Sequence, residues 1–384
     1  MKRKIMVITG RRAEYGLMRE TLKEIVKNPK LDLNLVVTGN HLIKELGDTL
    51  KQIEEDGFEI SNVVDSYPKD DEGASMAFSL GDLICKLTYI VKKDKPDIIV
   101  VLTDLGHALA GAIVGSHMNI PVAHVHGGDI SGTIDESIRH ATTKFSHIHF
   151  PATKKSAERI RQLGEEDWRI HTVGAPGLDE ILNKRLLSKK ELFDKYNLGE
   201  NRPLFLIIQH PVTTESNIAG NQMNITMDAV SEFSSQKVIL YPNADAGSKQ
   251  IIDVIKKYSD NEDIKIFKNL ERNIYLSILK NADVLIGNSS SGIIEAPSFK
   301  TGVVNIGNRQ FGRERASNVI DVDFNRSQII SAIDKILNDK KFIKKLKECN
   351  SPYGDGQAGK RISKILAEIK IDYGLIQKKF CDIK

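Results

Sequence analysis

Short runs of consecutive apolar residues recur along the chain, and each ends in a polar or glycine-rich turn that leads into a helical pattern. Residues 97–102, 121–125 and 284–286 are examples. A near-continuous apolar run, without alternating polar positions, is typical of a strand buried on both faces of a parallel sheet. Strands that alternate with helices at this spacing predict a doubly wound α/β architecture.

The alternation of strands and helices occurs in two series, and the pattern is interrupted between them. The first series ends near the turn at residues 173–177, and the polar stretch 188–202 precedes the second series. We therefore expect an α/β protein of two Rossmann-like lobes that face each other across a central cleft. The predicted lobes are residues 1–180 and 181–384, with the last helices packing back toward the first lobe.

Composition and charge exclude several classes of function. The 55 basic and 51 acidic residues leave a net charge of +4, and the lysine-rich C-terminal segment is not interleaved with aromatic residues, so no nucleic acid is expected as a partner. The first apolar segment is too short to insert into a membrane or to span it. We expect a cytoplasmic protein that does not bind a membrane.

The patterns typical of metal and redox sites are missing. Cys85, Cys349 and Cys381 lack metal-ligand or redox spacing, and Cys85 falls in an apolar helical pattern that predicts a core position. A divalent metal held by Asp and His groups is the weaker alternative, because no helical His pair or Ca²⁺ loop occurs. The G-x-G-x-x-G fingerprint is absent after the first strand, so we expect no nicotinamide or flavin cofactor.

The segment 284–295 combines an apolar run, a Gly/Ser-rich turn and a helical pattern with a carboxylate one turn in. At such a helix start, unpaired N–H groups and the helix dipole favour an anion. Ser290 and Ser291 add hydroxyl donors, and Gly292 lets the backbone approach a phosphate. Glu295 can accept hydrogen bonds from vicinal hydroxyls, such as those of a ribose. An ordinary N-capped helix is the alternative.

Other polar side chains also gather at the predicted strand ends, where ligands of open α/β folds bind. The first lobe contributes Arg11, Arg12, Asp104, His126, Asp129, Asp135 and Glu136. The second contributes His210, Asn243, Asp245, Asn288, Ser290, Ser291, Gly292, Glu295 and Arg313. One of the two arginines could instead pair with Glu14. A diphosphate held by the second lobe, with its sugar facing carboxylates and a histidine, suits general acid/base chemistry on the sugar.

Several motifs resemble the UDP-N-acetylglucosamine 2-epimerases, in particular the hydrolysing branch that feeds sialic- and legionaminic-type acid synthesis. They are TGRRAEYG at 9–16, VTG at 37–39, Asp104, GGD at 127–129, GTIDESIRH at 132–140, VGAPG at 173–177, GNSSSGIIE at 287–295 and SPYGDG at 351–356. They occur in order over essentially the whole chain. The resemblance implies the two-lobed fold that many nucleotide-sugar glycosyltransferases share.

The resemblance also implies a reaction without metal or redox cofactor. A base removes the C2 proton of a UDP-sugar while UDP leaves C1, and water adds to the resulting glycal. Arg12, Ser290, Ser291 and Glu295 would hold UDP, while Asp104, Asp135 and His210 would serve the acid/base and leaving-group steps. The chain has Leu105 where the family usually has arginine, and His126 where many hydrolysing members have glutamate. His126 and Asp129 are therefore further candidates for the C2 base.

We expect a UDP-sugar as the substrate, most simply UDP-N-acetylglucosamine converted to N-acetylmannosamine and UDP, and a homodimer or homotetramer. A close variant is a UDP-2,4-diacetamido-2,4,6-trideoxyhexose of a legionaminic acid pathway. Two other classes stay open: a retaining glycosyltransferase, which would need an acceptor, and a non-catalytic nucleotide-sugar binder.

Overall fold

The structure is a computed structural model that describes residues 2–43, 49–66, 73–130, 134–183, 185–199, 201–242 and 246–382. The chain divides into two compact units. Unit 1 comprises Met1–Asn183 and Tyr353–Lys384, and unit 2 comprises Lys184–Pro352. We propose that these units are the two domains of the protein.

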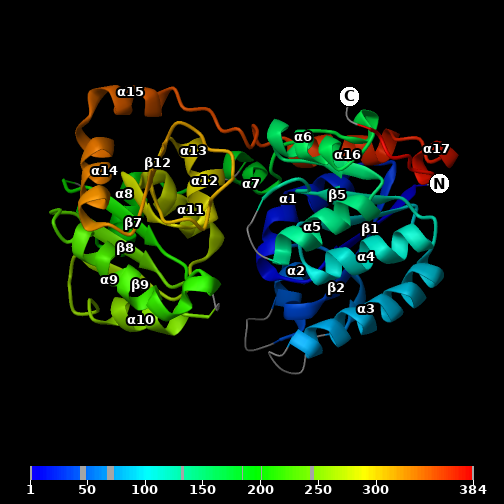
Figure 1. The fold of residues 1–384 in the computed structure, drawn as a ribbon, viewed down its shortest axis with the longest axis horizontal. Coiled ribbons are helices and arrows are strands. Elements are labelled where there is room, and N and C mark those ends of the chain that lie inside the picture. Colours follow the sequence, from blue (N-terminus) through cyan, green and yellow to red (C-terminus); the bar gives the residue numbers. More distant parts are fainter. Residues whose placement is uncertain are drawn as a thin grey trace. The chain divides into compact units, whose positions relative to one another are not determined.

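Unit 1 contains a six-stranded parallel sheet with the order β3-β2-β1-β4-β5-β6 (Figure 1). Its strands are β1 (Arg3–Thr9), β2 (Leu31–Thr38), β3 (Ile60–Val64), β4 (Ile98–Leu102), β5 (Val122–Val125) and β6 (Ile148–Phe150). Its helices are α1 (Arg12–Lys27), α2 (Thr49–Glu55), α3 (Gly73–Asp94), α4 (Gly106–His117), α5 (Ile134–Phe145), α6 (Lys154–Gln162), α7 (Gly177–Asn183), α16 (Ala358–Glu368) and α17 (Tyr373–Ile376), with short 3₁₀ turns η1 (Gly39–Leu42) and η3 (Asp167–Arg169).

The apolar runs of unit 1 are buried on both faces, as their sequence predicts. Along β4, Ile98 and Val100 belong to a core that includes α1 and α16, while Ile99 and Val101 belong to a core that includes α3 and α4. Successive strand residues point to opposite faces, so a strand without polar positions needs cover on both sides. The helices on the two faces supply that cover.

The last part of the chain returns to unit 1. Helix α16 packs beside α1, where Ser363 donates a hydrogen bond to the Glu24 carbonyl (2.9 Å). The first two N–H groups of α16, from Ala358 and Gly359, donate to the Asp179 carboxylate at 2.9 and 2.6 Å. Burial raises the pKa of Asp179, although these two donors act in the opposite direction.

Unit 2 repeats the architecture, with the sheet order β12-β11-β10-β7-β8-β9. Its strands are β7 (Leu204–Ile208), β8 (Gln236–Leu240), β9 (Ile264–Phe267), β10 (Val284–Gly287), β11 (Gly302–Ile306) and β12 (Val319–Val322). Its helices are α8 (Lys189–Tyr196), α9 (Ala219–Val230), α10 (Ser248–Lys256), α11 (Arg272–Asn281), α12 (Ser290–Ile294), α13 (Ala296–Phe299), α14 (Arg326–Asn338) and α15 (Lys340–Lys347), with the 3₁₀ turn η4 (Thr213–Ile218). The predicted fold class, two Rossmann-like α/β units, is confirmed.

One core prediction is wrong. Cys85 is exposed on α3, because Leu83, Leu87 and Val91 occupy the face of this helix that packs into the core. The apolar pattern extends around the helix, so composition alone did not distinguish the covered face from the exposed one.

Candidate functional site

Each sheet has one point where the strand order reverses, and in open α/β sheets ligands bind at the carboxyl ends of the strands there. In unit 1 this point lies between β1 and β4, which are followed by Gly10-Arg11 and Thr103-Asp104. In unit 2 it lies between β7 and β10, which are followed by Gln209-His210 and Asn288-Ser289. Four of the predicted site residues, Arg11, Asp104, His210 and Asn288, therefore follow the strands that define a ligand-binding edge in the two units.

Asp104 is anchored by a buried arginine. The Arg139 guanidinium, from α5, donates to Asp104 Oδ2 and also to the Asp129 carbonyl (2.9 Å). Thr103, just before the aspartate, has φ of +61°, which is strained for a β-branched residue. The Thr103 carbonyl accepts a hydrogen bond from His124 Nε2 (2.7 Å), so His124 carries its proton on Nε2.

His126 and Asp129 form the second part of this cluster. His126 also has a left-handed backbone, with φ of +62°, and its Nδ1 lies 3.8 Å from Asp129 Oδ2. The other oxygen, Asp129 Oδ1, accepts a hydrogen bond from the Ser156 hydroxyl (2.5 Å). A carboxylate whose position is set by Ser156 can orient the imidazole for proton transfer. The structure thus brings together Asp104, His126 and Asp129, and adds Arg139, for which the sequence reasoning assigned no role.

A buried glutamate joins the β1 turn to α4. Glu14 Oε2 accepts hydrogen bonds from the Gly10 N–H (2.9 Å) and interacts with His107 Nε2 (2.7 Å). The alternative that Glu14 pairs with Arg11 or Arg12 is therefore wrong, because its carboxylate is turned into the protein. Sequence reasoning missed His107, and its position three residues after Asp104, in the first turn of a helix, was the available signal.

Both arginines of the β1 turn are exposed, and neither side chain forms an ion pair with a described residue. Arg11 lines a cavity of about 310 Å³ in unit 1. The other lining residues are Gly10, Thr38, Gly39, Asn40, Ser66, Met76, Ser79, Leu80, Leu83, Leu105, Gly106 and His107. Its volume suits a small ligand, and its wall is apolar on the α3 side and polar at the ends of β1 and β2.

The remaining predicted residues of unit 1 belong to α5. Glu136 lies in the first turn of this helix, and its Oε1 lies 3.8 Å from His140 Nε2. Asp135 falls in the same turn, but its side chain is outside the described part of the structure, as are residues Asn243 and Asp245 of unit 2. His124, His147 and His149 are buried, and burial lowers the pKa of His124 to about 3 and the pKa values of His147 and His149 to about 4.

In unit 2 the ends of β7 and β10 are held together by Asn288. Its side chain accepts from the His210 N–H (2.7 Å) and donates to the His210 carbonyl (2.9 Å). Arg309 and Gln310 donate to the Asn288 carbonyl at 3.1 and 2.9 Å, so the loop after β11 closes on this turn. Arg313 lies on the same loop and is half-buried.

The predicted Gly/Ser-rich turn does lead into a helix, with one difference from the expectation. Ser289 is the N-cap of α12 and accepts a hydrogen bond from the Ser291 N–H (3.4 Å), and Ser290 is the first helical residue. The helix ends at Ile294, because Pro297 has no N–H to donate to the preceding turn, and a second short helix follows. Gly292 packs against β11, where a Cβ atom would lie 2.9 Å from Val303 Cγ1.

Glu295 lies at the junction of the two short helices rather than within one helix. Its Oε1 accepts from Arg272, while its Oε2 is buried and within hydrogen-bonding geometry of no described donor. Burial, and then the charge and side-chain contact of Glu295, raise the pKa of the Tyr275 hydroxyl. A buried carboxylate oxygen with spare acceptor capacity is suited to a ligand hydroxyl.

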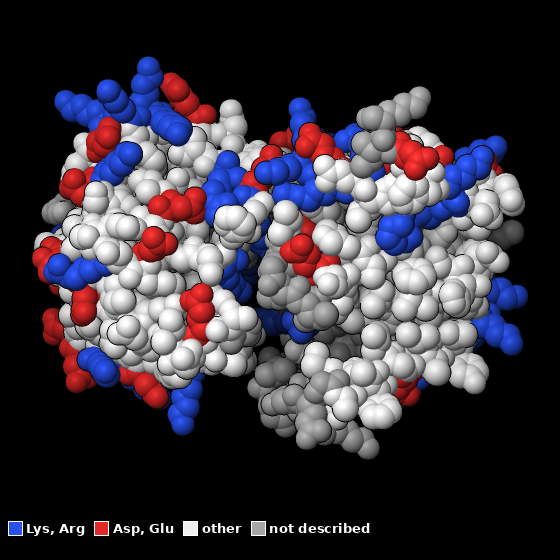
Figure 2. All heavy atoms as spheres, viewed as in Figure 1, with Lys and Arg blue, Asp and Glu red and all other residues white. Residues whose placement is uncertain are grey.

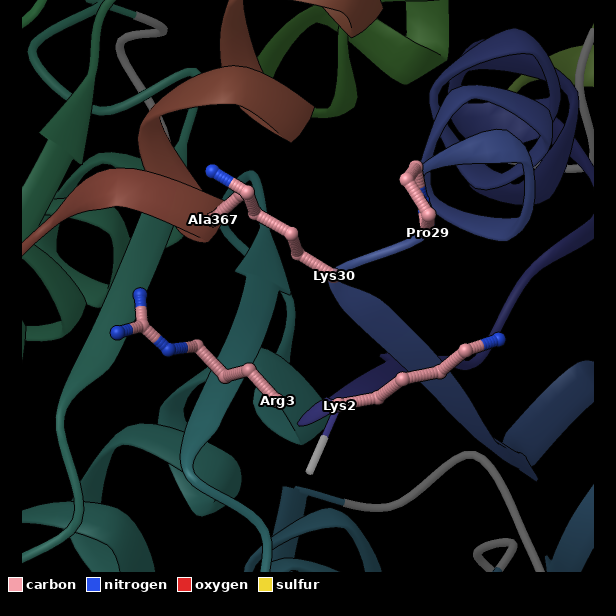
Figure 3. A pocket seen from close by; sticks show the side chains of 5 residues that line it. All are labelled: Lys2, Arg3, Pro29, Lys30 and Ala367. Carbon is pink, nitrogen blue, oxygen red and sulfur yellow. The ribbon is translucent and has the colours of Figure 1, made fainter.

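A second hollow, of about 550 Å³, lies at the opposite edge of the unit 1 sheet. Figure 3 shows that its Lys2 and Arg3 side chains point apart, so they do not converge on a common ligand. Among the described residues, no group of three or more His, Cys, Asp or Glu side chains could hold a metal ion. Metal-independent chemistry stays a prediction.

The chain is similar to proteins of a described family and to solved structures. Residues 23–367 match a family model described as UDP-N-acetylglucosamine 2-epimerase. The chain is 40% identical, over 98% of its length and 99% of the relative, to a UDP-N,N'-diacetylbacillosamine 2-epimerase (hydrolyzing) of Legionella pneumophila. It is 32% identical, over all of both chains, to a UDP-N-acetylglucosamine 2-epimerase of Neisseria meningitidis. A crystal structure of UDP-GlcNAc 2-epimerase from Neisseria meningitidis bound to UDP-GlcNAc has a TM-score of 0.82 at 19% identity, covering 95% of this chain and 100% of that chain, which shows a common fold.

Proposed function

The chain belongs to the UDP-N-acetylglucosamine 2-epimerase family, as its motifs indicate, and from that premise we propose that it is a hydrolysing 2-epimerase of a UDP-linked 2-acetamido sugar. A base takes the C2 proton, the C2–H electron pair forms a C1=C2 double bond, and the C1–O bond breaks to release UDP. Water then adds, with hydroxyl at C1 and a proton on the opposite face of C2. The product is the free 2-epimer.

The observation that carries this proposal is the cluster of Asp104, His126 and Asp129 around buried Arg139. The C2 proton is weakly acidic, so its removal must be coupled to UDP departure. The groups that transfer protons must therefore be positioned next to the sugar. We assign Asp104 and the His126–Asp129 pair to these proton transfers. In unit 2, the turn formed by Ser289, Ser290 and Ser291 (the serine turn) would bind the diphosphate. Glu295 Oε2 would accept hydrogen bonds from the ribose hydroxyls.

For the sugar, we propose a 2,4-diacetamido-2,4,6-trideoxyhexose in preference to N-acetylglucosamine. The cavity in unit 1 has a wall formed by Met76, Leu80, Leu83 and Leu105. A C6 methyl group and the methyl of a C4 acetamido group would gain from contact with such a wall, whereas the hydroxyls of N-acetylglucosamine would lose hydration there. The relative at 40% identity is named for a substrate of this class, which supports the choice.

Turnover in D₂O tests the reaction and the sugar separately. UDP-diacetylbacillosamine and UDP-N-acetylglucosamine are each incubated with the protein, without an acceptor, and the products are followed by NMR. We expect free 2-epimer with deuterium at C2, and a kcat/KM about 10-fold or more higher for the diacetamido substrate. Product without deuterium at C2, or UDP release only with an acceptor, would contradict the epimerase. Equal kcat/KM values would contradict only the choice of sugar.

A variant of the apolar wall refines this test. Leu105→Asn should lower kcat/KM for the diacetamido substrate about 10-fold and leave that for UDP-N-acetylglucosamine within threefold, because it removes only apolar contact. Leu109→Asn is the matched control, since Leu109 is also a half-buried leucine of this region but does not line the cavity. A parallel fall for both substrates would mean that Leu105 does not discriminate between them.

A further inference from the structure

The imidazole of His107 is held by a buried carboxylate at the cavity of unit 1. His107 lies in the first turn of α4, and its Nε2 lies 2.7 Å from Glu14 Oε2 of α1. The two side chains belong to residues that are only 9% and 4% exposed. Glu14 Oε2 also accepts from the Gly10 N–H, while its Oε1 is buried without a partner among the described residues. The carboxylate therefore fixes the imidazole ring against the β1 turn.

This contact also fixes which ring nitrogen carries the proton. An ionised carboxylate only accepts hydrogen bonds, so the Nε2 atom of His107 must donate. In the neutral ring, Nδ1 then keeps its lone pair, and it forms no hydrogen bond with a described residue. The ring lies so close to Gly10 that a Cβ there would overlap Nδ1. Nδ1 of His107 thus offers a hydrogen-bond acceptor of fixed direction to a ligand in the cavity that this residue lines.

The helices that border the cavity supply little other charge. The remaining side chains that α3 and α4 contribute to its lining are Met76, Ser79, Leu80 and Leu83, and none of them is titratable. Figure 2 shows few charged side chains on the surface over these two helices as well. The imidazole of His107 is therefore a polar group set beside a mainly apolar wall.

An acetamido group matches this combination of contacts. It needs an acceptor for its N–H, a donor for its carbonyl oxygen and apolar surface for its methyl group. Around the cavity, His107 Nδ1 can accept, the Arg11 guanidinium only donates, and Met76 and Leu80 are apolar. The cavity lining thus contains all three kinds of contact.

We propose that His107 determines the specificity for the C4 substituent of the sugar, with its Nδ1 accepting the N–H of a C4 acetamido group and Glu14 as its positioning residue. This inference rests on the proposed function, which places the sugar in this cavity. A C4 hydroxyl depends less on Nδ1, because it can rotate and donate to Ser66 or Asn40, which also line the cavity. The direction of an amide N–H is fixed, because the amide is planar and attached to the sugar ring.

Two variants with amide side chains separate the two nitrogens of His107. His107→Gln places an amide near the position of Nε2, so it keeps a donor for Glu14 but has no polar atom at the position of Nδ1. It should lower kcat/KM for UDP-diacetylbacillosamine at least ~10-fold, mainly through KM, and leave kcat/KM for UDP-N-acetylglucosamine within about threefold. His117→Gln, at an exposed position at the end of α4, is the matched control and should change neither value.

His107→Asn is the complementary variant. Its amide lies near the position of Nδ1 and keeps an acceptor there, although it no longer reaches Glu14. The ratio of the two kcat/KM values should therefore stay within about threefold of the wild-type ratio. Because this ratio compares two substrates on one preparation, a partial loss of folded protein does not change it. A ratio that is unchanged in His107→Gln, or that falls equally in both variants, would overturn the inference.

Binding distinguishes a failure of this inference from a failure of the proposed function. A wild type that forms no free 2-epimer from either substrate would contradict the proposed reaction alone. Calorimetry would then still test His107. The Kd of UDP-diacetylbacillosamine should rise at least ~10-fold in His107→Gln, while the Kd of UDP, which lacks the sugar, should stay within about twofold. An unchanged Kd for the sugar nucleotide, or a wild type that binds it no more tightly than UDP, would overturn the inference.

Discussion

Asp104 and Arg139 show how single residues of unit 1 depend on each other. The arginine is buried, so its charge requires a partner, and the aspartate supplies it while facing the ligand-binding edge. Thr103 and His126 directly follow the neighbouring strands β4 and β5, and their strained backbone sets the direction in which the chain leaves these strands. Such strain persists where the surrounding structure enforces it, and it is frequent at functional sites.

Asp104→Asn should reduce turnover at least ~100-fold, because an amide cannot accept a proton. UDP affinity, measured by calorimetry, should stay within twofold, since Asp104 is not among the groups proposed to hold UDP. Asp167→Asn, which changes an exposed aspartate of unit 1, is the control and should leave turnover unchanged. An Asp104→Asn enzyme with more than a tenth of wild-type turnover would remove Asp104 from the proton-transfer step.

At the scale of elements, the approach of β10 to β7 depends on Gly287. Its φ is +133°, and a Cβ there would overlap the carbonyl oxygen of Ile208. The same two strand ends are joined by the hydrogen bonds of Asn288 to His210. The serine turn therefore sits on a strand end that admits no side chain.

Gly287→Ala should destabilise unit 2 by at least about 3 kcal/mol, which for a unit of this size is a fall in Tm of roughly 6–12 °C. Gly16→Ala in α1 is the contrasting control. A Cβ at position 16 contacts nothing within 4 Å, so this change should stabilise unit 1 by about 0.5–1 kcal/mol. Differential scanning calorimetry checks both. A Tm for Gly287→Ala within 2 °C of wild type would contradict the close approach of the strands.

At the scale of the whole molecule, the histidines are distributed unevenly between the units. Nine of the ten histidines lie in unit 1, and His210 is the exception. Burial lowers the pKa of His124 to about 3 and the pKa values of His41, His147 and His149 to about 4. Between these values and the ordinary pKa near 6.5, the unfolded chain binds more protons than the folded one, so the stability of unit 1 falls as pH decreases.

Acidification should therefore unfold unit 1 before unit 2. Each buried histidine costs about 1.4 kcal/mol per pH unit below 6.5, and unit 1 should lose several kcal/mol between pH 6.5 and pH 5. The single tryptophan, Trp168, belongs to unit 1, so its fluorescence reports that unit while far-UV circular dichroism reports both. As the pH is lowered toward 5, the unfolding transition seen by fluorescence should occur at a higher pH than the transition seen by circular dichroism. Coincident transitions would contradict the prediction. His117→Gln, an exposed position, should leave the pH dependence unchanged.

The local features of this protein could be predicted from its sequence. An apolar run without alternation requires cover on both faces, so runs such as 97–102 already predict parallel strands with helices on either side. The strand ends and their polar residues follow from the same runs, and Asp104, Asn288 and Ser290 are predicted as candidate site residues in this way. Each of these inferences uses only residues that are neighbours along the chain.

Pairings between distant residues depended on the tertiary structure. The sheet order places β1 beside β4, so that Glu14 meets His107, and helix α5 brings Arg139 to Asp104. The packing of α16 beside α1 and the exposure of Cys85 also depend on the tertiary structure. Periodicity reports which residues share a face of one element, but only packing determines which other element covers that face.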